Sequence, residues 1–446
     1  MPCTQKRKNV RSGWERSQLL LVPWVACVLI SCTGSSGGND GGEVTDGDIR
    51  QDDGSHQDGD GRQDDGALPD GGDPADDGGP ADGGDDGGNL TDCEEMPTEE
   101  TFGAEPNPTC NPIGGGPGYS RIIAETDGSV TCVASTREEL LDCLENAGPG
   151  DVVFVTASAD IDMTGTPSVT IPDGVTLASD RGLGGSSGAK IKRTENLNGG
   201  WEEPMFVVGG DNVRVTGLRL EGEMYPQDYG NEEGETYESD YLVGIYAEER
   251  RGFEVDNCEM YGWAWSCVSL RQNAEDPIPY IHHNSIHHNQ ARGEGYGVNL
   301  YGGNALIEAN LFDYNRHAIT GAGHAGEKYE ARYNIILGNG DAIGGHHFDV
   351  HQDEDGGDFA GDHFLIHHNT FRAGVGENGG ILASVGIRHR PTTGCFIDHN
   401  LFEAISTETE DGKPIWQRNS SENLFATDNM WMEVLYPTND GIVWYL

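Results

Sequence analysis

A short pattern in which asparagine stands between two apolar stretches recurs along the second half of the chain. The pattern reads apolar-x-x-Asn-x-apolar, as in residues 281–286, and successive asparagines lie 24 to 35 residues apart. Its asparagines are Asn257, Asn284, Asn310, Asn334, Asn369, Asn400 and Asn429. A repeat of this length is typical of solenoids and propellers. Because the residues around each asparagine alternate in polarity, without a helical period, we expect stacked β-strands and an all-β protein.

The repeat extends toward the N-terminus through residues with turn and capping propensities. Gly217 fits one rung earlier, and residues 169–177 read as an early rung. Asparagine and glycine tolerate the left-handed backbone of a tight turn, and stacked turns place like residues about 4.8 Å apart. Thr136 and Glu139 form the sequence signature of a capping box that opens a short amphipathic helix. We therefore expect a solenoid of about 8–11 rungs whose N-terminal end carries a capping helix.

These features resemble the right-handed parallel β-helix of the pectate-lyase-like proteins. The resemblance covers roughly residues 118–435, and the helix followed by Pro149, Gly150 and Asp151 is similar to the N-terminal cap of many β-helix polysaccharide lyases. It implies binding of acidic polysaccharide along one sheet. It also implies abstraction of the proton alpha to a uronate carboxyl by lysine or arginine, often with calcium as cofactor.

An upstream strand in each rung supplies candidate site residues. Aligned strands near 244–248, 267–271, 297–301, 318–322, 347–351 and 386–390 place apolar residues inward and polar ones outward. The predicted outward column contains Arg271, Asn299, Tyr301, Thr320, His347, Asp349, His351, Arg388 and Arg390. A local cluster of basic groups in so acidic a chain is a candidate anion site.

We expect His351, Arg388 and Arg390 to be catalytic, because histidine exchanges protons near neutral pH and arginine could fill the family's basic role. The predicted substrate-binding residues are Arg271, Asn299, Tyr301, Thr320, Arg316 and His317. Arg316 and His317 could instead form a salt-bridged turn. No lysine lies on the aligned strands, which departs from the family's usual mechanism.

Carboxylates near His351 are candidate metal ligands. Asp349, Asp353, Asp355 and Asp358 could hold calcium, although a solvated acidic loop explains the last three equally well. His347, Asp349 and His351 could instead hold a transition metal. The histidine pairs at 282–283, 287–288 and 367–368 are expected to recur at the same repeat position, beside the turn asparagine, so we interpret them as a structural ladder, although such pairs could also bind metal.

The N-terminal segments predict export. A basic stretch precedes an apolar run at 19–30, and residues 29–32 resemble a bacterial lipobox. The resemblance implies cleavage before Cys32 and lipid attachment to its sulfur. The next residue is Thr33, whereas an aspartate at this position would resemble an inner-membrane retention signal. Residues 33–92, rich in aspartate and glycine, predict a disordered linker, and 93–446 the β-helix. We expect a lipid-anchored protein of the bacterial outer membrane or cell surface, acting as a monomer.

Charge and cysteine content add two constraints. The net charge is −49, and residues 93–446 alone carry 57 acidic and 20 basic residues, which argues against a nucleic-acid partner. Cysteines in an exported protein favour disulfides, and proximity suggests Cys93–Cys110, Cys132–Cys143 and Cys258–Cys267.

Three functions remain open from the sequence. The leading one is a lyase of uronate-containing polysaccharide. A non-catalytic β-helix serving as a binding or adhesion module is the main alternative, because a fold does not imply a function. A glycoside hydrolase is third, since it requires two facing carboxylates and only Asp349 is clearly available in the predicted column.

Overall fold

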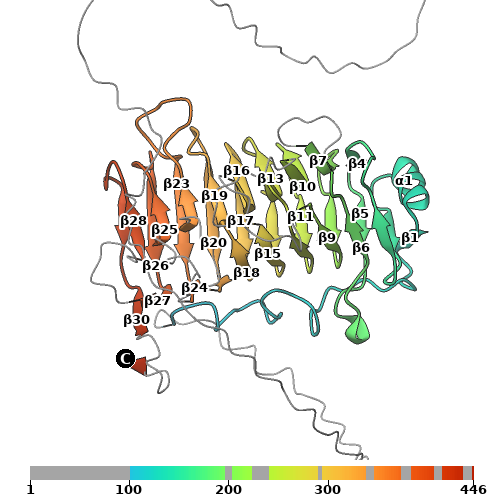
Figure 1. Cartoon of the computed structure of the whole chain (residues 1–446), viewed down its shortest axis with the longest axis horizontal. Helices are drawn as coiled ribbons and strands as arrows, with labels where there is room; N and C mark the ends of the chain where they lie inside the picture. Colours follow the sequence, from blue (N-terminus) through green and yellow to red (C-terminus); the bar gives the residue numbers. More distant parts are fainter. Residues whose placement is uncertain are drawn as a thin grey trace, which may run out of the picture. The chain divides into compact units, whose positions relative to one another are not determined.

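The computed structural model describes residues 101–195, 203–223, 241–289, 294–337, 346–372, 383–405, 414–434 and 444–445. These residues form three long, almost entirely parallel sheets, and each turn of the chain adds one strand to each sheet (Figure 1). The architecture is the right-handed parallel β-helix that the repeat predicts. The signal segment, Cys32 and the linker at 33–92 lie outside the described residues and stay predictions.

Sheets A and B follow one another along each rung. Sheet A contains β1 (Val130–Ala134), β2 (Val152–Val155), β5 (Thr176–Ala178), β8 (Arg214–Thr216), β11 (Glu254–Asp256), β14 (Tyr280–His282), β17 (Asn304–Glu308), β20 (Lys328–Arg332), β23 (His363–His367), β26 (Gly394–Asp398) and β29 (Leu424–Ala426). Sheet B contains β3 (Asp160–Asp162), β6 (Lys190–Lys192), β9 (Arg219–Glu221), β12 (Glu259–Tyr261), β15 (Ser285–Asn289), β18 (Leu311–Asn315), β21 (Ile335–Ile336), β24 (Thr370–Phe371), β27 (Leu401–Ile405), β30 (Met430–Val434) and β31 (Trp444–Tyr445).

The third sheet positions the candidate site. Sheet C contains β4 (Val169–Ile171), β7 (Glu203–Val208), β10 (Leu242–Glu248), β13 (Ser266–Arg271), β16 (Tyr296–Tyr301), β19 (His317–Gly321), β22 (His346–Val350), β25 (Ala383–Ile387) and β28 (Ile415–Gln417). Among the described residues, the helices are α1 (Arg137–Asn146) and a short 3-10 turn at Leu183–Gly185. Thr136 caps α1, and Thr136 and Glu139 form both bonds of the predicted capping box.

Aliphatic columns fill the interior. In sheet A, Val255, Ile281, Ile307, Ala331 and Ile366 pair rung by rung, and all five are fully buried. Burying an aliphatic side chain of this size contributes about 1.5–3 kcal/mol. Repeating one apolar position per rung is therefore enough to explain why the turns stack.

An asparagine ladder runs along the turn between sheets A and B. The amide of Asn284 donates to Asn310 Oδ1 at 3.0 Å, and the same contact continues through Asn334, Asn369, Asn400 and Asn429. The sequence alignment was wrong by one residue at Asn257. Val255 pairs with Ile281, so Asn257 stands opposite His283 and takes its left-handed backbone, with φ of 53° and 52°. The residue before the ladder asparagine carries the positive φ, and Asn257 and Gly217 occupy that place.

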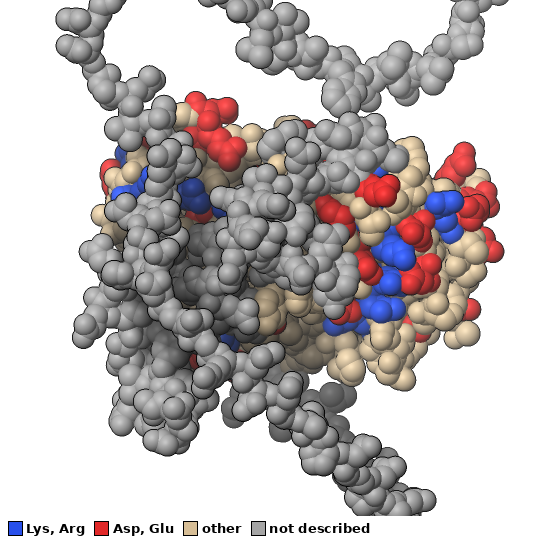
Figure 2. All heavy atoms as spheres, in the orientation of Figure 1, with Lys and Arg blue, Asp and Glu red and all other residues tan. Residues whose placement is uncertain are grey.

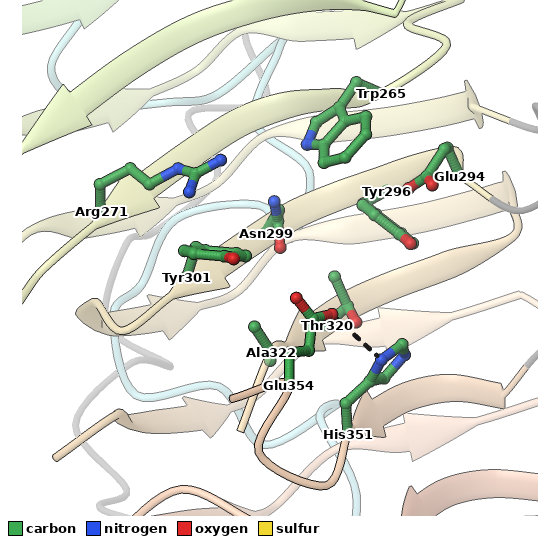
Figure 3. A pocket seen from close by; sticks show the side chains of 11 residues that line it. Trp265, Arg271, Glu294, Tyr296, Asn299, Tyr301, Thr320, Ala322, His351 and Glu354 are labelled. Atoms are coloured by element: carbon green, nitrogen blue, oxygen red, sulfur yellow. Dashed lines mark ion pairs between the residues drawn. The ribbon is translucent and has the colours of Figure 1, made fainter. Parts of the chain in front are cut away.

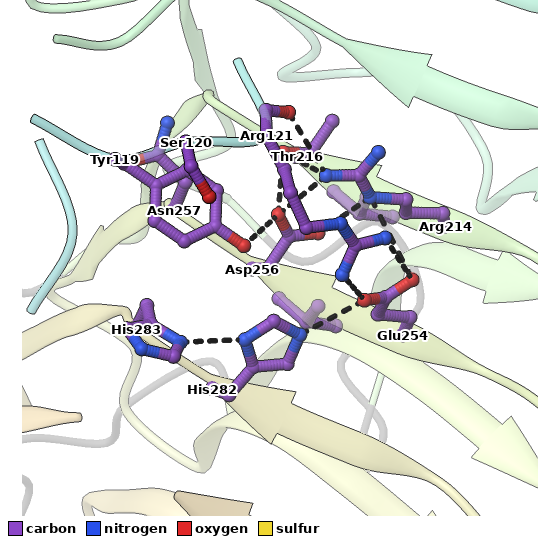
Figure 4. Close-up of polar contacts among 12 residues, drawn as sticks. Tyr119, Ser120, Arg121, Arg214, Thr216, Glu254, Asp256, Asn257, His282 and His283 are labelled. Atoms are coloured by element: carbon purple, nitrogen blue, oxygen red, sulfur yellow. Dashed lines mark hydrogen bonds and ion pairs between the residues drawn. The ribbon is translucent and has the colours of Figure 1, made fainter. Parts of the chain in front are cut away.

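A segment at 101–121 runs along the solenoid beside this turn (Figure 1). Gly103 N donates to His399 O at 2.9 Å, Gly114 N to Ala309 O at 2.9 Å, and Gly116 N to Asn257 Oδ1 at 2.7 Å. Tyr119 donates to the buried Asp256 carboxylate at 2.8 Å (Figure 4). We call this segment the strap. It crosses several rungs and bonds to turn backbone at Ala309 and His399 and to the turn side chain of Asn257.

Cysteine pairing is as expected at one of the three proposed positions. Cys132 and Cys143 form a disulfide with Cα atoms 5.9 Å apart, which ties β1 to α1. The Cys258–Cys267 pairing was wrong, because Cys258 follows β11 of sheet A whereas Cys267 lies on β13 of sheet C, and both thiols are free and buried. Cys93 lies outside the described residues.

Opposite charges alternate on the first rungs of sheet B. Lys190 lies 2.9 Å from Asp160 and 3.2 Å from Glu221, and Lys192 lies near Asp160 and Asp162. Figure 2 shows basic and acidic side chains interleaved at this end of the solenoid. Exposed pairs of this kind contribute at most about 1 kcal/mol each. No helix of the described residues is long and apolar enough to cross a bilayer.

Candidate functional site

The outward face of sheet C gathers polar side chains from four consecutive rungs. Ser269 pairs with Asn299, Asn299 with Thr320, and Thr320 with Asp349, so these residues form one column. Their neighbours Val268, Val298, Ile319 and Phe348 pair in the same register and face the core. The alignment made from the sequence is therefore correct for this part of the sheet.

A pocket of about 380 Å³ opens over β13, β16 and β19 (Figure 3). It is lined by Trp265, Arg271, Glu294, Tyr296, Asn299, Tyr301, Thr320, Gly321, Ala322, His351 and Glu354. Of the six predicted substrate-binding residues, four line it directly: Arg271, Asn299, Tyr301 and Thr320. We call it the central pocket.

A second pocket of about 700 Å³ adjoins the central one. The two share Arg271 and Tyr301, and the Arg271 guanidinium carbon lies 3.8 Å from the centre of the Tyr301 ring. Glu248, Glu249, Asp353 and Asp355 supply an acidic rim to this second pocket. A ligand long enough to span the Arg271–Tyr301 pair can therefore contact both pockets.

Asp349 lies at the centre of a charged cluster beside the central pocket. Its carboxylate is fully buried and accepts hydrogen bonds from Arg388 Nη2 at 2.6 Å and Arg388 Nε at 3.2 Å. His351 Nε2 lies 3.2 Å, His317 Nε2 3.3 Å and His346 Nδ1 3.6 Å from its oxygens. His351 Nδ1 lies 3.7 Å from Glu354, and Figure 3 shows this ion pair at the pocket wall.

These neighbours set the protonation of the cluster. Burial alone opposes ionisation of Asp349, but the nearby imidazole of His317 and the contacts of His346 and His351 hold the pKa of the carboxyl well below its usual value. Burial also opposes the charged form of His351, yet Asp349 and Glu354 raise its pKa above the ordinary histidine value. The carboxylate thus favours a positive imidazole facing the pocket.

Two carboxyl groups of the central pocket were missed by sequence reasoning. Burial raises the pKa of Glu294, whereas the contact with His351 lowers the pKa of Glu354. Glu294 precedes β16 and Glu354 follows β22, so neither lies on the aligned strands. The alternation of strand residues carries no signal for side chains that reach the pocket from the ends of strands.

The prediction for His347 was wrong. His347 is buried and its ring lies 6.3 Å from that of Phe371, in the apolar interior, while His346 faces the cluster and stacks on Trp416. His346 and Asp349 both face outward although they are three residues apart. The alternation of β22 is therefore interrupted at its start, and a strict two-residue period assigns the wrong histidine.

The remaining predicted residues lie around the cluster. Arg388 contacts Asp349, and His317 contacts it from β19. Arg316 donates from Nη1 to the Tyr296 hydroxyl at 3.4 Å, at the edge of the central pocket. Arg390 instead donates to the main-chain oxygen of Asp358 at 3.1 Å and lies 3.4 Å from Glu422. It lines neither pocket.

The candidate calcium ligands separate into two places. Asp349 belongs to the histidine cluster, whereas Asp353 and Asp355 lie 3.1 Å and 3.7 Å from His324 Nδ1. The side chain of Asp358 is exposed. Calcium takes six to eight oxygen ligands, and two carboxylates beside an imidazole supply few of them. These residues fit calcium poorly, and no chemical step is assigned to it.

In fold, the chain is similar to solved β-helix proteins. An alginate lyase from Paenibacillus is 14% identical, with a TM-score of 0.42, over 69% of this chain and 95% of that one. A family 28 exopolygalacturonase from Yersinia enterocolitica is 11% identical, with a TM-score of 0.33, over 70% and 76%. The A-module of a mannuronan C-5 epimerase from Azotobacter vinelandii is 12% identical, with a TM-score of 0.28, over 68% and 97%.

By sequence, no family model and no curated protein matches the chain. Structural similarity at this level of identity describes the fold alone. The function must therefore be argued from the side chains of sheet C.

Proposed function

We propose that the protein binds a uronate-containing polysaccharide across sheet C and cleaves it by β-elimination in the central pocket. One observation carries the proposal. The ring of His351, backed by the buried Asp349 carboxylate at 3.2 Å, lines the same pocket as Arg271 and Asn299. A proton-transferring group and a carboxylate-binding group thus face one cavity.

The proposed reaction assigns one role to each of these side chains. His351, in its neutral form, accepts the proton from C5 of the uronate. Electrons of that C–H bond form the C4–C5 double bond, and the C4–O bond breaks. Arg271 and Asn299 stabilise the negative charge that develops on the uronate carboxyl group. The Tyr301 hydroxyl, in the same pocket, donates a proton to the departing oxygen.

Asp349 and Arg388 act through His351. The Asp349 carboxylate orients the imidazole, and the two hydrogen bonds from Arg388 hold the carboxylate in place. Both are positioning residues in this proposal, whereas the sequence pointed to Arg388 as a catalytic group. Arg390 has no role, because it is engaged by Asp358 and Glu422.

We also propose that the protein is exported and anchored to the cell envelope by a lipid on Cys32, with residues 33–92 as a tether. The basic and apolar pattern at 1–32 supports this part. Metabolic labelling with a radioactive fatty acid tests it. Label should enter the wild-type chain and be absent from Cys32→Ser.

The reaction is tested with the full chain and a panel of pectate, alginate, chondroitin and a neutral glycan. Ultraviolet absorbance reports unsaturated products, and a separate assay reports new reducing ends. Unsaturated product from a uronate polymer supports the proposal. Retention of a glycan on an affinity column without either product would contradict it and favour a binding module.

A second reaction is favoured by one specific observation. Glu294 and Glu354 line the central pocket with pKa values shifted in opposite directions, as expected of a general acid and its ionised partner in a glycoside hydrolase. Reducing ends without unsaturation, lost in both Glu294→Gln and Glu354→Gln, would assign hydrolysis. Under β-elimination, neither variant removes the unsaturated product completely.

A further inference from the structure

The geometry points to a binding site for a divalent transition metal behind the central pocket, held by His317 Nε2, His346 Nδ1 and the Asp349 carboxylate. This inference concerns a second ligand of the protein and does not depend on which polysaccharide reaction takes place. The residues come from β19 and β22, which are paired neighbours in sheet C. It rests on distances, on two ring nitrogens that make no hydrogen bond, and on the groups that orient them.

The three donor groups are spaced as the ligands of one small ion are. His317 Nε2 lies 3.3 Å and His346 Nδ1 3.6 Å from Asp349 oxygens, and the three donor atoms all lie within 4.8 Å of one another. Bonds of about 2.0–2.2 Å to zinc place tetrahedral ligand atoms roughly 3.3–3.6 Å apart. The separations of the two imidazole nitrogens from the Asp349 oxygens fall in this range.

Both ring nitrogens are buried and make no hydrogen bond. His317 is fully buried and His346 is 6% exposed, and neither His317 Nε2 nor His346 Nδ1 has a hydrogen-bond partner. Burying a polar nitrogen without a hydrogen-bond partner is unfavourable, because the atom loses its bond to water. Two such nitrogens directed at one carboxylate indicate that a cation belongs between them.

The other nitrogen of His317 fixes which form of the ring faces the carboxylate. Its Nδ1 lies 2.5 Å from the main-chain oxygen of His346 and 3.3 Å from the main-chain nitrogen of the same residue. The oxygen can only accept a hydrogen bond, so the shorter contact favours the tautomer that donates from Nδ1. A neutral ring that donates from Nδ1 carries a lone pair on Nε2, which is repelled by a carboxylate oxygen but binds a metal ion. Metal-binding histidines usually donate their second N–H in this way.

The surroundings complete an outer layer of support. Arg388 donates to both oxygens of Asp349 and so orients the carboxylate. The His346 ring is stacked against Trp416, with centroids 4.8 Å apart, and lies parallel to His317 with centroids 6.1 Å apart. His351 also places its Nε2 3.2 Å from Asp349, but the donor atoms that all lie within 4.8 Å of one another are those of His317, His346 and Asp349.

The donor types decide which metal class fits. Two imidazole nitrogens and one carboxylate are the ligands of zinc, cobalt, nickel or manganese, whereas calcium and magnesium prefer oxygen. Three protein ligands also leave a coordination position open.

A second cluster, of Glu254, Asp256 and His282, has similar spacing. Both ring nitrogens of His282 have partners there, His283 at 2.7 Å and Glu254 at 2.9 Å, so this cluster lacks the unpartnered nitrogens of the proposed site (Figure 4).

The test uses the full chain, stripped with EDTA and transferred to metal-free buffer. Titration with Zn²⁺ alone is followed by calorimetry, and Co²⁺ is added separately to follow its visible absorption. We expect one equivalent to bind and a cobalt spectrum of low coordination number. His317→Ala and His346→Ala should weaken zinc binding at least about 100-fold. Asp349→Asn, which keeps the side-chain shape, should weaken it as well.

A matched control comes from the ladder on sheet B. His287 is less buried than His317 and His346, but it too lies beside a second histidine and a carboxylate, and His287→Ala should leave zinc binding unchanged. Near-ultraviolet circular dichroism verifies that each variant is folded. Absence of binding by the folded wild-type chain overturns the inference. The inference is also overturned if the His317→Ala/His346→Ala double variant still binds one equivalent of zinc, or if His287→Ala weakens zinc binding as much as the ligand variants do.

Discussion

Histidines and carboxylates occur both in the turn ladder and on the outer face of sheet C, but they form recurring pairs in the ladder and a single cluster on sheet C. In the ladder, His282–His283, His287–His288 and His367–His368 each make a contact between Nδ1 atoms of 2.7–2.9 Å. The first histidine of each pair reaches a glutamate, at 2.9–3.2 Å. On sheet C, His317, His346 and His351 surround one aspartate, and the arrangement occurs in no other described rung.

The difference separates structural histidines from candidate functional ones. The pairs at 282–283 and 367–368 share one position at the end of sheet A strands, whereas 287–288 lies on β15 of sheet B, which corrects the single repeat position expected from the sequence. The groups of all three contacts have partners, and such contacts stabilise the stack. The cluster on sheet C does not follow the repeat, and ring nitrogens in it make no hydrogen bonds. It therefore does not stabilise the stacking of the rungs. We therefore expect substitutions in the ladder to change stability, and substitutions on sheet C to change activity.

The largest expected effect is on catalysis. His351→Gln removes the proton acceptor and keeps a polar side chain, so kcat for unsaturated product should fall about 10²–10⁴-fold. The free energy of unfolding should change little. Both are measured on the same preparation, by absorbance and by urea denaturation. Arg251→Ala, which removes an exposed pair with Asp211 on the early rungs, is the control and should retain activity. A large loss of stability in His351→Gln would contradict the proposed distinction between structural and functional histidines.

The next effect is on stability. Asn310→Ala removes a side chain that accepts from Asn284 and donates to Asn334 and to the Ile281 carbonyl, all at 2.9–3.0 Å and buried. The free energy of unfolding should fall by about 2–4 kcal/mol, because buried partners lose hydrogen bonds. Asn429→Ala, at the less buried end of the ladder, should cost less. Equal losses at the two positions would show that the ladder is not a buried network.

The ladder should also make stability depend on pH. Burial, and then the charge of the adjacent histidine, lowers the pKa of His283 to about 3 and of His288 and His368 to about 4. In the unfolded chain these rings titrate near pH 6.5. Their contribution is complete above that pH and is lost progressively as pH falls toward 4.

The melting temperature should therefore fall between pH 6.5 and pH 4. His288→Asn removes a titrating ring and suits the positive φ of 57° at this position, so its melting temperature should fall less steeply. His287 and Tyr314 are the titratable groups that contact His288, and Glu259 in turn contacts His287. An unchanged slope would indicate that the half-buried ring stays accessible to protons in the folded state.

The smallest effect concerns the strap. Tyr119→Phe removes one hydrogen bond to Asp256, which still accepts from Arg214 and Thr216. We expect a loss of about 1 kcal/mol in the free energy of unfolding. Tyr314→Phe, at an exposed ladder position, should have no measurable effect. If the two variants behave alike, the strap does not contribute through this bond.

The sequence predicts the repeated parts of the molecule well because each rung restates the same physical requirement. Val298, Ile319 and Phe348 show the strand register, and Asn284 to Asn429 show the turn. Features that occur only once in the molecule are harder to predict. Asn257 was placed one residue out because asparagine also suits the left-handed position beside the ladder.

The candidate site was predicted only in part. Arg271, Asn299, Tyr301, Thr320 and His351 lie on regular stretches, so alternation placed them in one pocket. Glu294 and Glu354 lie beyond strand ends, and His346 lies where β22 breaks its alternation. The strap at 101–121 lies before the repeat begins, and its contacts span more than a hundred residues of sequence. Local pattern contains no information about such contacts.

The central claim is that His351 removes a proton from C5 of a bound uronate. The most direct measurement is nuclear magnetic resonance of uronate oligosaccharides incubated in D₂O with the wild-type chain and with His351→Gln. We predict loss of the C5 proton signal and appearance of a C4 vinyl proton with the wild type. With His351→Gln both changes should be absent, although the oligosaccharide still binds. An unchanged C5 signal with wild-type protein that binds the oligosaccharide, or an equal rate in His351→Gln, would contradict the account.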